Sequence, residues 1–108
     1  MAQGKTNWER LLSQFTNRNA SRLTTIEVDD IELGAQQEEA SYPLRGVAYD
    51  HRADQVEIML GDLSSTAHLT HTVARPASID LQSGTDGRDK TLRISTEGGR
   101  QTLLRLLD

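Results

Sequence analysis

The pattern of apolar positions first predicts a helix near the N-terminus. Four side chains recur at the spacing of one helix face: Trp8, Leu11, Leu12 and Phe15. Thr6 and Glu9 have the spacing of a capping box, in which each side chain accepts a hydrogen bond from the other residue's backbone N–H. The polar run 16–19 then interrupts the stripe. We therefore expect a helix over about residues 7–19, packed against another element by this stripe.

After residue 21, apolar and polar positions alternate with the period of a β-strand. The alternating runs are 56–60, 68–73, 78–82 and 91–96, and residues 23–28 are rich in the β-branched residues that favour strands. The breaks at 51–54, 61–65, 75–76, 83–87 and 97–99 are short and turn-like, and one contains Asp86-Gly87, a strong hairpin signal. Short links join antiparallel neighbours, because parallel neighbours need a long crossover. The sequence thus predicts an α+β fold, with one N-terminal helix on an antiparallel meander of five to seven strands. Curling of this sheet towards a barrel is left open.

Two stretches are less regular. Residues 103–107 are apolar at both parities apart from Arg105, which fits either a central strand covered on both faces or a short helix; we favour the strand. Residues 29–43 contain five acidic residues and no basic residue. Their apolar parity shifts across Asp29-Asp30, which indicates a bulge or a turn. We expect an exposed edge strand and a loop there.

Composition limits the classes of protein. A chain of 108 residues fits one domain over 1–108, with residues 1–6 as a flexible N-terminus. The absence of cysteine excludes a disulfide framework, a thiolate metal site and a cysteine nucleophile. A net charge of −4 argues against tight nucleic-acid binding. With no long apolar run and no apolar core of a signal peptide, we expect a cytoplasmic protein.

The candidate site is centred on the segment from His68 to His71. Two histidines three residues apart can share a metal on a helix, but on a strand they point to opposite faces. We therefore expect no metal, and no cofactor either. His71 shares parity with Leu69 and Val73, which predicts a buried, hydrogen-bonded histidine, and His68 is then a surface residue. Three residues are the ligand-binding candidates: His71, His68 and Arg75.

Other patterns give no catalytic residue. Ser64 and Ser65 lie in a turn-like segment without the motifs of a serine nucleophile. The glycines form neither a dinucleotide-binding nor a phosphate-loop pattern. Five basic residues of the last third could form one basic face across antiparallel strands, although solvation or pairing with acids is the usual role: Arg88, Lys90, Arg93, Arg100 and Arg105.

Several segments resemble a family of small bacterial proteins that is known only as a domain of unknown function. The resemblance spans nearly the whole chain. It rests on a W-E-x-x-L helix beginning at Trp8, on the runs 24–28 and 43–50, on the end of the chain from Gly99 to Leu106, and above all on L-T-H-x-V-x-x-P at 69–76. The family supplies no activity or site residue to transfer. It implies a stand-alone bacterial domain.

These observations favour a non-catalytic binding or accessory module. We expect it to be a homo-oligomer, most simply a homodimer, because an open strand edge can pair with another copy or with an unidentified protein partner. The alternative is a small-molecule-binding enzyme that uses His71 with a nearby carboxylate. An RNA-associated sheet using the late arginines is a third hypothesis, weakened by the scarcity of aromatic residues for stacking bases.

Overall fold

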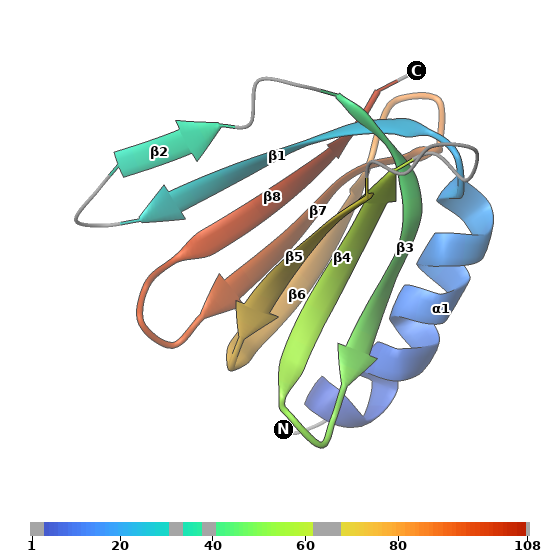
Figure 1. The fold of residues 1–108 in the computed structure, drawn as a ribbon. Helices are drawn as coiled ribbons and strands as arrows, with labels where there is room; N and C mark the ends of the chain where they lie inside the picture. The colour runs from blue at the N-terminus through green and yellow to red at the C-terminus, as the bar shows by residue number, and fades with distance from the viewer. Residues whose placement is uncertain (1–3, 31–33, 38–40, 62–67, 108) are drawn as a thin grey trace.

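The computed structural model describes residues 4–30, 34–37, 41–61 and 68–107. Within these residues, a short 3₁₀ helix and one α-helix precede eight strands, and the strands form a single antiparallel sheet (Figure 1). The elements follow in the order η1 (Gly4–Asn7), α1 (Trp8–Asn19), β1 (Leu23–Asp30), β2 (Gly34–Gln37), β3 (Tyr42–Asp50), β4 (Gln55–Gly61), β5 (His68–Ala74), β6 (Pro76–Ser83), β7 (Asp89–Thr96) and β8 (Gln101–Leu106). The predicted α+β fold is confirmed.

Seven strands form a continuous path in the order β5-β4-β3-β1-β8-β7-β6, and β2 pairs with β1 beside this path. The pairing of β1 explains the side branch. Its first residues, Leu23 and Thr24, pair with β3, whereas 27–30 pair with β2. On its other edge β1 pairs with β8 over most of its length. The sheet therefore splits after Thr24, where β1 and β3 diverge.

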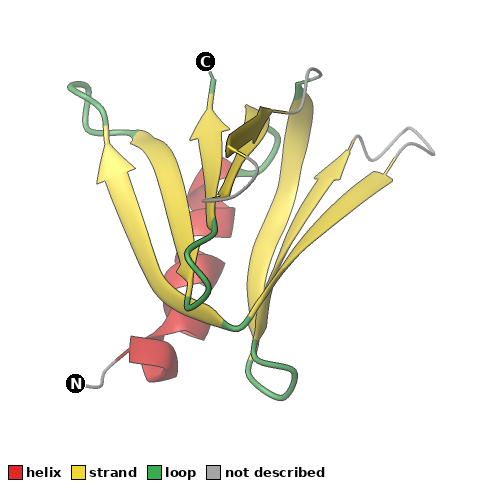
Figure 2. Cartoon of the chain, turned by 90° about the vertical axis from the view of Figure 1, so that its left-hand side faces the viewer, coloured by secondary structure: helices red, strands yellow, loops and turns green. Residues whose placement is uncertain are grey.

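The sheet is strongly curled but does not close into a barrel. Its two end strands, β5 and β6, are consecutive in the chain and are joined by Arg75 alone. Arg75 adopts a positive φ of 50°, which turns the chain sharply at this corner. Figure 2 shows the two arms of the sheet diverging upwards from their junction at the bottom. The inward face of this open curl carries the core and, near its mouth, a cavity.

The core joins the apolar stripe of α1 to the inward positions of the strands. Trp8, Leu12 and Phe15 are buried, as predicted, while Leu11 is half-buried. On β4 every second residue is inward and buried, as the period of two requires. The buried core residues of the sheet are Ile26, Leu44, Val47, Tyr49, Val56, Ile58, Leu60, Val73, Leu92, Ile94, Leu104 and Leu106.

The helix lies where the sequence places it, but its first turn differs. The α-helix begins after Asn7, whose side chain makes no capping hydrogen bond, and a 3₁₀ turn precedes it. The predicted capping box places the cap at Thr6, one residue earlier, and the predicted start at about residue 7 agrees with the observed start at Trp8 to within one residue. The side chain of Thr6 lies outside the described part of the structure.

Strand pairing decides the structure of most of the two irregular stretches, residues 103–107 and 29–43. Residues 101–106 form strand β8 between β1 and β7, so the strand prediction is confirmed. The prediction that this strand is covered on both faces was wrong. One face is buried, whereas the residues of the other face are only half-buried; the buried residues are Thr102, Leu104 and Leu106, and the half-buried ones include Leu103 and Arg105. In the acidic stretch, β2 forms the expected edge strand. Residues 31–33 and 38–40 lie outside the described residues.

Candidate functional site in the mouth of the curled sheet

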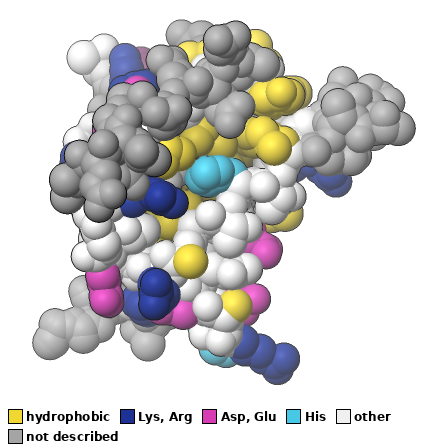
Figure 3. All heavy atoms as spheres, turned by 60° about the vertical axis from the view of Figure 1, so that its left-hand side comes forward, with side chains coloured by type: hydrophobic (Ala, Val, Ile, Leu, Met, Phe, Trp, Pro, Cys, Tyr) yellow, Lys and Arg dark blue, Asp and Glu magenta, His cyan; other side chains and the backbone are white. Residues whose placement is uncertain are grey.

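A cavity of about 580 Å³ opens on the inward side of the sheet. It lies between β5, on one arm, and β1, β8 and the β7–β8 turn on the other. Figure 3 shows a histidine side chain in a hollow on this face, with apolar side chains beside it and a basic side chain nearby. The volume is within the range typical of small-molecule pockets.

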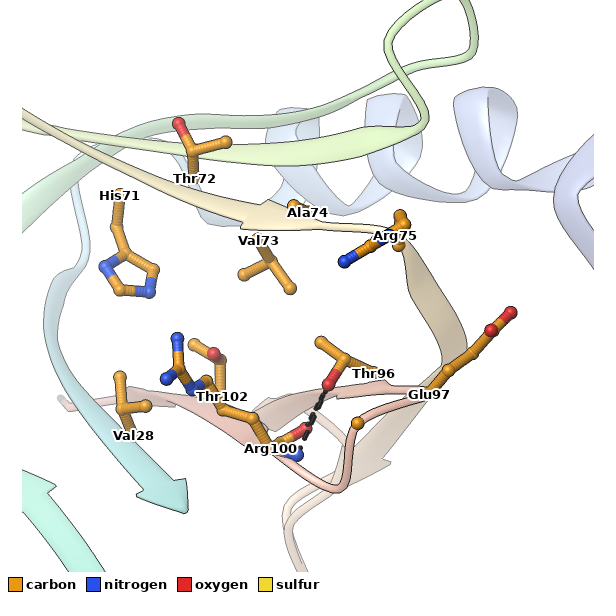
Figure 4. Close-up of a pocket in the computed structure, with 11 residues that line it drawn as sticks. Val28, His71, Thr72, Val73, Ala74, Arg75, Thr96, Glu97, Arg100 and Thr102 are labelled. Atoms are coloured by element: carbon orange, nitrogen blue, oxygen red, sulfur yellow. Dashed lines mark hydrogen bonds between the residues drawn. The ribbon is translucent and has the colours of Figure 1, made fainter. Parts of the chain in front are cut away.

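His71 and Val73 form the wall that belongs to β5. Both occupy inward positions, opposite Ile58 and Val56 of β4. Val73 is 4% exposed, whereas His71 is only half-buried, and its imidazole points into the cavity (Figure 4). The predicted parity of His71 is thus confirmed. Its predicted full burial was wrong: the arms of the sheet diverge at this position, and none of the described strands covers the side chain.

The opposite wall is the turn between β7 and β8. Thr96 and Arg100 close this turn through three hydrogen bonds: the N–H of Thr96 donates to the carbonyl of Arg100 at 2.9 Å, the N–H of Arg100 donates to Thr96 Oγ1 at 3.2 Å, and that hydroxyl donates to the Arg100 carbonyl at 3.3 Å. Gly99 takes the positive φ of 92° that the turn needs. The turn directs the Arg100 guanidinium towards the cavity, facing β5 (Figure 4).

Thr102 lines the cavity where β8 leaves the turn. It pairs with Val28 on β1 and with Ile94 on β7, so its side chain has the inward orientation of the core. The residue is 1% exposed, yet its Oγ1 has no hydrogen-bond partner among the described residues. A buried hydroxyl without a partner costs stability relative to an apolar group of the same shape. Its oxygen is directed towards the cavity (Figure 4), although almost none of the surface of this atom is accessible.

Arg75 lines the cavity at the corner between β5 and β6. Its backbone N–H donates to the carbonyl of Asp54 at 2.8 Å, which fastens the corner to the β3–β4 turn. Asp54 is itself held by Tyr49 and Lys5, whose donor atoms lie 2.7 and 2.9 Å from its carboxylate. These hydrogen bonds, from Tyr49 first and Lys5 second, hold the pKa of Asp54 below its ordinary value. The anchored corner fixes where the Arg75 side chain begins.

The same hydrogen bond makes the Tyr49 hydroxyl harder to ionise. Its hydrogen bond to the Asp54 carboxylate, together with burial, raises the pKa of Tyr49 to about 12. Tyr49 also packs edge-on against Trp8 at a ring separation of 5.2 Å. The corner that carries Arg75 is therefore tied through Asp54 to the core and to the start of α1.

Positive charge predominates on the cavity wall. Arg75 and Arg100 carry two positive charges, and Glu97 carries the single negative charge among the lining residues of the described structure. The Glu97 carboxylate points away from His71 (Figure 4). The hypothesis of an enzyme that pairs His71 with a nearby carboxylate gains no support from Glu97 and stays untested.

The structure brings together two of the three predicted ligand-binding residues, His71 and Arg75. The side chain of His68 lies outside the described residues, so its predicted outward direction stays a prediction. Sequence reasoning missed Thr102 and did not assign Arg100 to a cavity. One signal was available: Thr102 is the polar residue in the otherwise apolar inward series that continues with Leu104 and Leu106.

The late basic residues do not form one face. Arg93 pairs with Asp80 across β6 and β7 at 3.9 Å, and Arg105 pairs with Glu27 across β8 and β1 at 2.6 Å. These are the cross-strand pairs that were expected. A second cavity, of about 480 Å³, is lined by Arg88, Lys90 and Arg105 among others. Arg100 alone of the five lines the first cavity.

The described part of the chain offers neither a cluster of metal ligands nor a membrane-spanning helix. There, no three His, Asp or Glu side chains are grouped so that they could hold a metal ion. No described helix has the length and apolar character needed to cross a membrane.

Comparison with known proteins identifies relatives without a known activity. The family described as "Family of unknown function (DUF5335)" matches residues 3–108. An "Uncharacterized protein" of Aquifex aeolicus (strain VF5) is 26% identical over 102 residues, which cover 94% of this chain and 86% of that protein. No solved structure matches the chain.

Proposed function

The chain belongs to this family of unknown function, and we propose that it is a non-catalytic binding module that takes a small molecule into the mouth of the curled sheet. The observation that carries the proposal is the Thr102 hydroxyl, which is buried at the cavity wall without a partner among the described residues. Sequences keep such a group at a cost in stability when it serves another purpose. Hydrogen bonding to a bound molecule is that purpose here.

The rest of the cavity fits this role. Side chains from both arms of the sheet converge on it, and each is fixed by regular structure: His71 by β5, Arg100 by the β7–β8 turn and Thr102 by β8. Val28 and Val73 add apolar surface to the wall. An apolar wall with a few placed polar groups is the usual composition of a small-molecule site.

The test is Thr102→Val, an isosteric change whose effects on stability and on binding have opposite signs. Because an unpartnered buried hydroxyl is removed, the free energy of unfolding of the ligand-free protein should rise by up to about 1 kcal/mol. Binding of small molecules found by an NMR screen of ¹⁵N-labelled protein should weaken at the same time. Thr70→Val, an exposed position on the same strand as His71, is the matched control.

Two results would overturn the proposal. One is a screen in which no compound shifts the amide signals of the lining residues. The other is a Thr102→Val variant that is destabilised, which would show that the hydroxyl is satisfied within the folded chain.

A further inference from the structure

We infer that the molecule held in this cavity carries an oxyanion, a carboxylate or a phosphate, attached to a small apolar body. The inference rests on the proposed function and adds the chemical class of the ligand. Three observations carry it: the charges on the wall, their placement around the cavity, and the apolar surface between them.

The charges come first. Among the lining residues that the structure describes, Arg75 and Arg100 outnumber Glu97; the Glu97 carboxylate points away from the cavity, whereas the Arg100 guanidinium points into it. A guanidinium offers paired N–H donors that match the two oxygens of a carboxylate or phosphate. The cavity wall therefore favours an anion over a cation of equal size.

The placement of these groups comes second. Arg100 and His71 approach the cavity from opposite arms of the sheet, and Thr102 lies on the wall with its hydroxyl turned inward (Figure 4). An imidazole N–H, a hydroxyl and a guanidinium are all donors to oxygen. These donors come from β5, from β8 and from the β7–β8 turn, so they reach the cavity from different sides. A compact group with several acceptor oxygens can accept hydrogen bonds from more than one of these donors at once.

The apolar surface comes third. Val73 lines the cavity from β5 and Val28 lines it from β1. A free inorganic ion would leave both in contact with water, whereas a ligand with a short hydrocarbon body would cover them. The cavity volume of about 580 Å³ leaves room for such a body beside the charged group.

The experiment compares four probes of defined chemistry by NMR titration of the ¹⁵N-labelled chain. Hexanoate carries a carboxylate on an apolar body, hexanamide is its neutral counterpart, hexylamine is its cationic counterpart, and inorganic phosphate carries the anion alone. We expect hexanoate to bind at the lining residues about tenfold more tightly than hexanamide, and hexylamine more weakly than both. If phosphate displaces hexanoate, the site accepts a phosphate group as well as a carboxylate. If phosphate has no effect, the oxyanion of the ligand is a carboxylate.

Variants of Arg100 distinguish binding at this cavity from a general effect of the protein's charge. Arg100→Gln should weaken hexanoate about tenfold and leave hexanamide unchanged, and Arg100→Lys should restore part of the loss. Arg88→Gln removes the same charge at the β6–β7 turn, outside this cavity, and should leave both affinities unchanged. The amide spectrum of each variant reports whether it is folded.

Each adverse result has a distinct meaning. Equal binding of hexanoate and hexanamide overturns the oxyanion and leaves the proposed binding function standing. Loss of hexanoate affinity in Arg88→Gln as large as in Arg100→Gln overturns the assigned position. No binding of hexanoate or phosphate at tens of millimolar overturns the inference outright, and the proposed function is then decided by the separate small-molecule screen.

Discussion

The Thr16 hydroxyl on α1 is hydrogen-bonded to both backbone polar groups of Val47 on β3. The N–H of Val47 donates to Thr16 Oγ1 at 2.9 Å, and the same hydroxyl donates to the Val47 carbonyl at 3.1 Å. The contact sits beside the register shift of β3 between Leu44 and Gly46, where the ladder with β4 is interrupted. A helix side chain thus supplies hydrogen bonds to β3 at an irregular point of the sheet.

Thr16→Val should lower the free energy of unfolding by about 1–3 kcal/mol. The shape of the side chain is kept, but both polar groups of Val47 lose a partner at a part-buried position. Urea denaturation followed by circular dichroism measures the change. Thr70→Val on an exposed strand position is the control, and an equal loss in both variants would contradict the role of the hydroxyl.

Gly46→Ala should also destabilise the fold, by about 1 kcal/mol, because a Cβ at this position lies 3.3 Å from Thr16 Cγ2. Thr16→Ser removes that methyl group and keeps the hydroxyl. The cost of Gly46→Ala should therefore be smaller in the Thr16→Ser background. A double-mutant cycle by urea denaturation measures the coupling; additive effects would refute the contact.

Acid should weaken the attachment of α1 to β7. Burial of the Asp89 carboxylate opposes its ionisation, but hydrogen bonds from Arg18 and Asn19, at 2.9 and 2.6 Å, outweigh this and lower the pKa of Asp89. A carboxylate with a lowered pKa in the folded state contributes stability above its unfolded pKa and loses that contribution as the pH falls through the folded value.

Asp89→Asn tests this dependence. The variant should be less stable than the wild type at neutral pH, and the difference should shrink as the pH falls below about 4, the ordinary aspartate range. Urea midpoints measured between pH 7 and acid pH give the comparison. A difference that stays constant over the whole range would show that Asp89 contributes no ionised contact.

Trp8→Ala should cost about 3–5 kcal/mol, because the indole is 7% exposed and packs edge-on against Tyr49. Thermal unfolding followed by circular dichroism is the measurement, since this substitution removes the single tryptophan that fluorescence would report. Trp8→Phe keeps an aromatic ring in the core and should recover most of the loss. A loss below about 1 kcal/mol for Trp8→Ala would contradict the packing.

We expect a homodimer in solution. β6 ends the strand order and pairs only with β7 among the described strands, so one of its edges is open to a second copy. A net charge of −4 is too small to keep subunits apart. Light scattering over a tenfold concentration range should approach twice the chain mass of 12.0 kDa. A constant mass near 12 kDa at high micromolar concentration would reject the dimer.

Local pattern determined the elements of this protein. The apolar stripe of α1 and the alternation of β4 and β7 follow from the periods of a helix and a strand, so these three elements and their buried faces were readable from the sequence. The inward parity of His71 followed in the same way. Parity fixes which face of a strand a residue occupies, because successive side chains point to opposite sides.

Only the tertiary structure decided whether the inward face of a strand is covered by core residues or faces a cavity. The one-residue corner at Arg75 brings the two end strands together at one point and lets them diverge elsewhere, so His71 faces a cavity where parity alone predicted core. The same curvature places Arg100 opposite His71, although no strand pairing joins β5 to β8. The proximity of these two side chains depends on the curvature and the strand order of the whole sheet. Neither property can be read from the local spacing of apolar and polar residues.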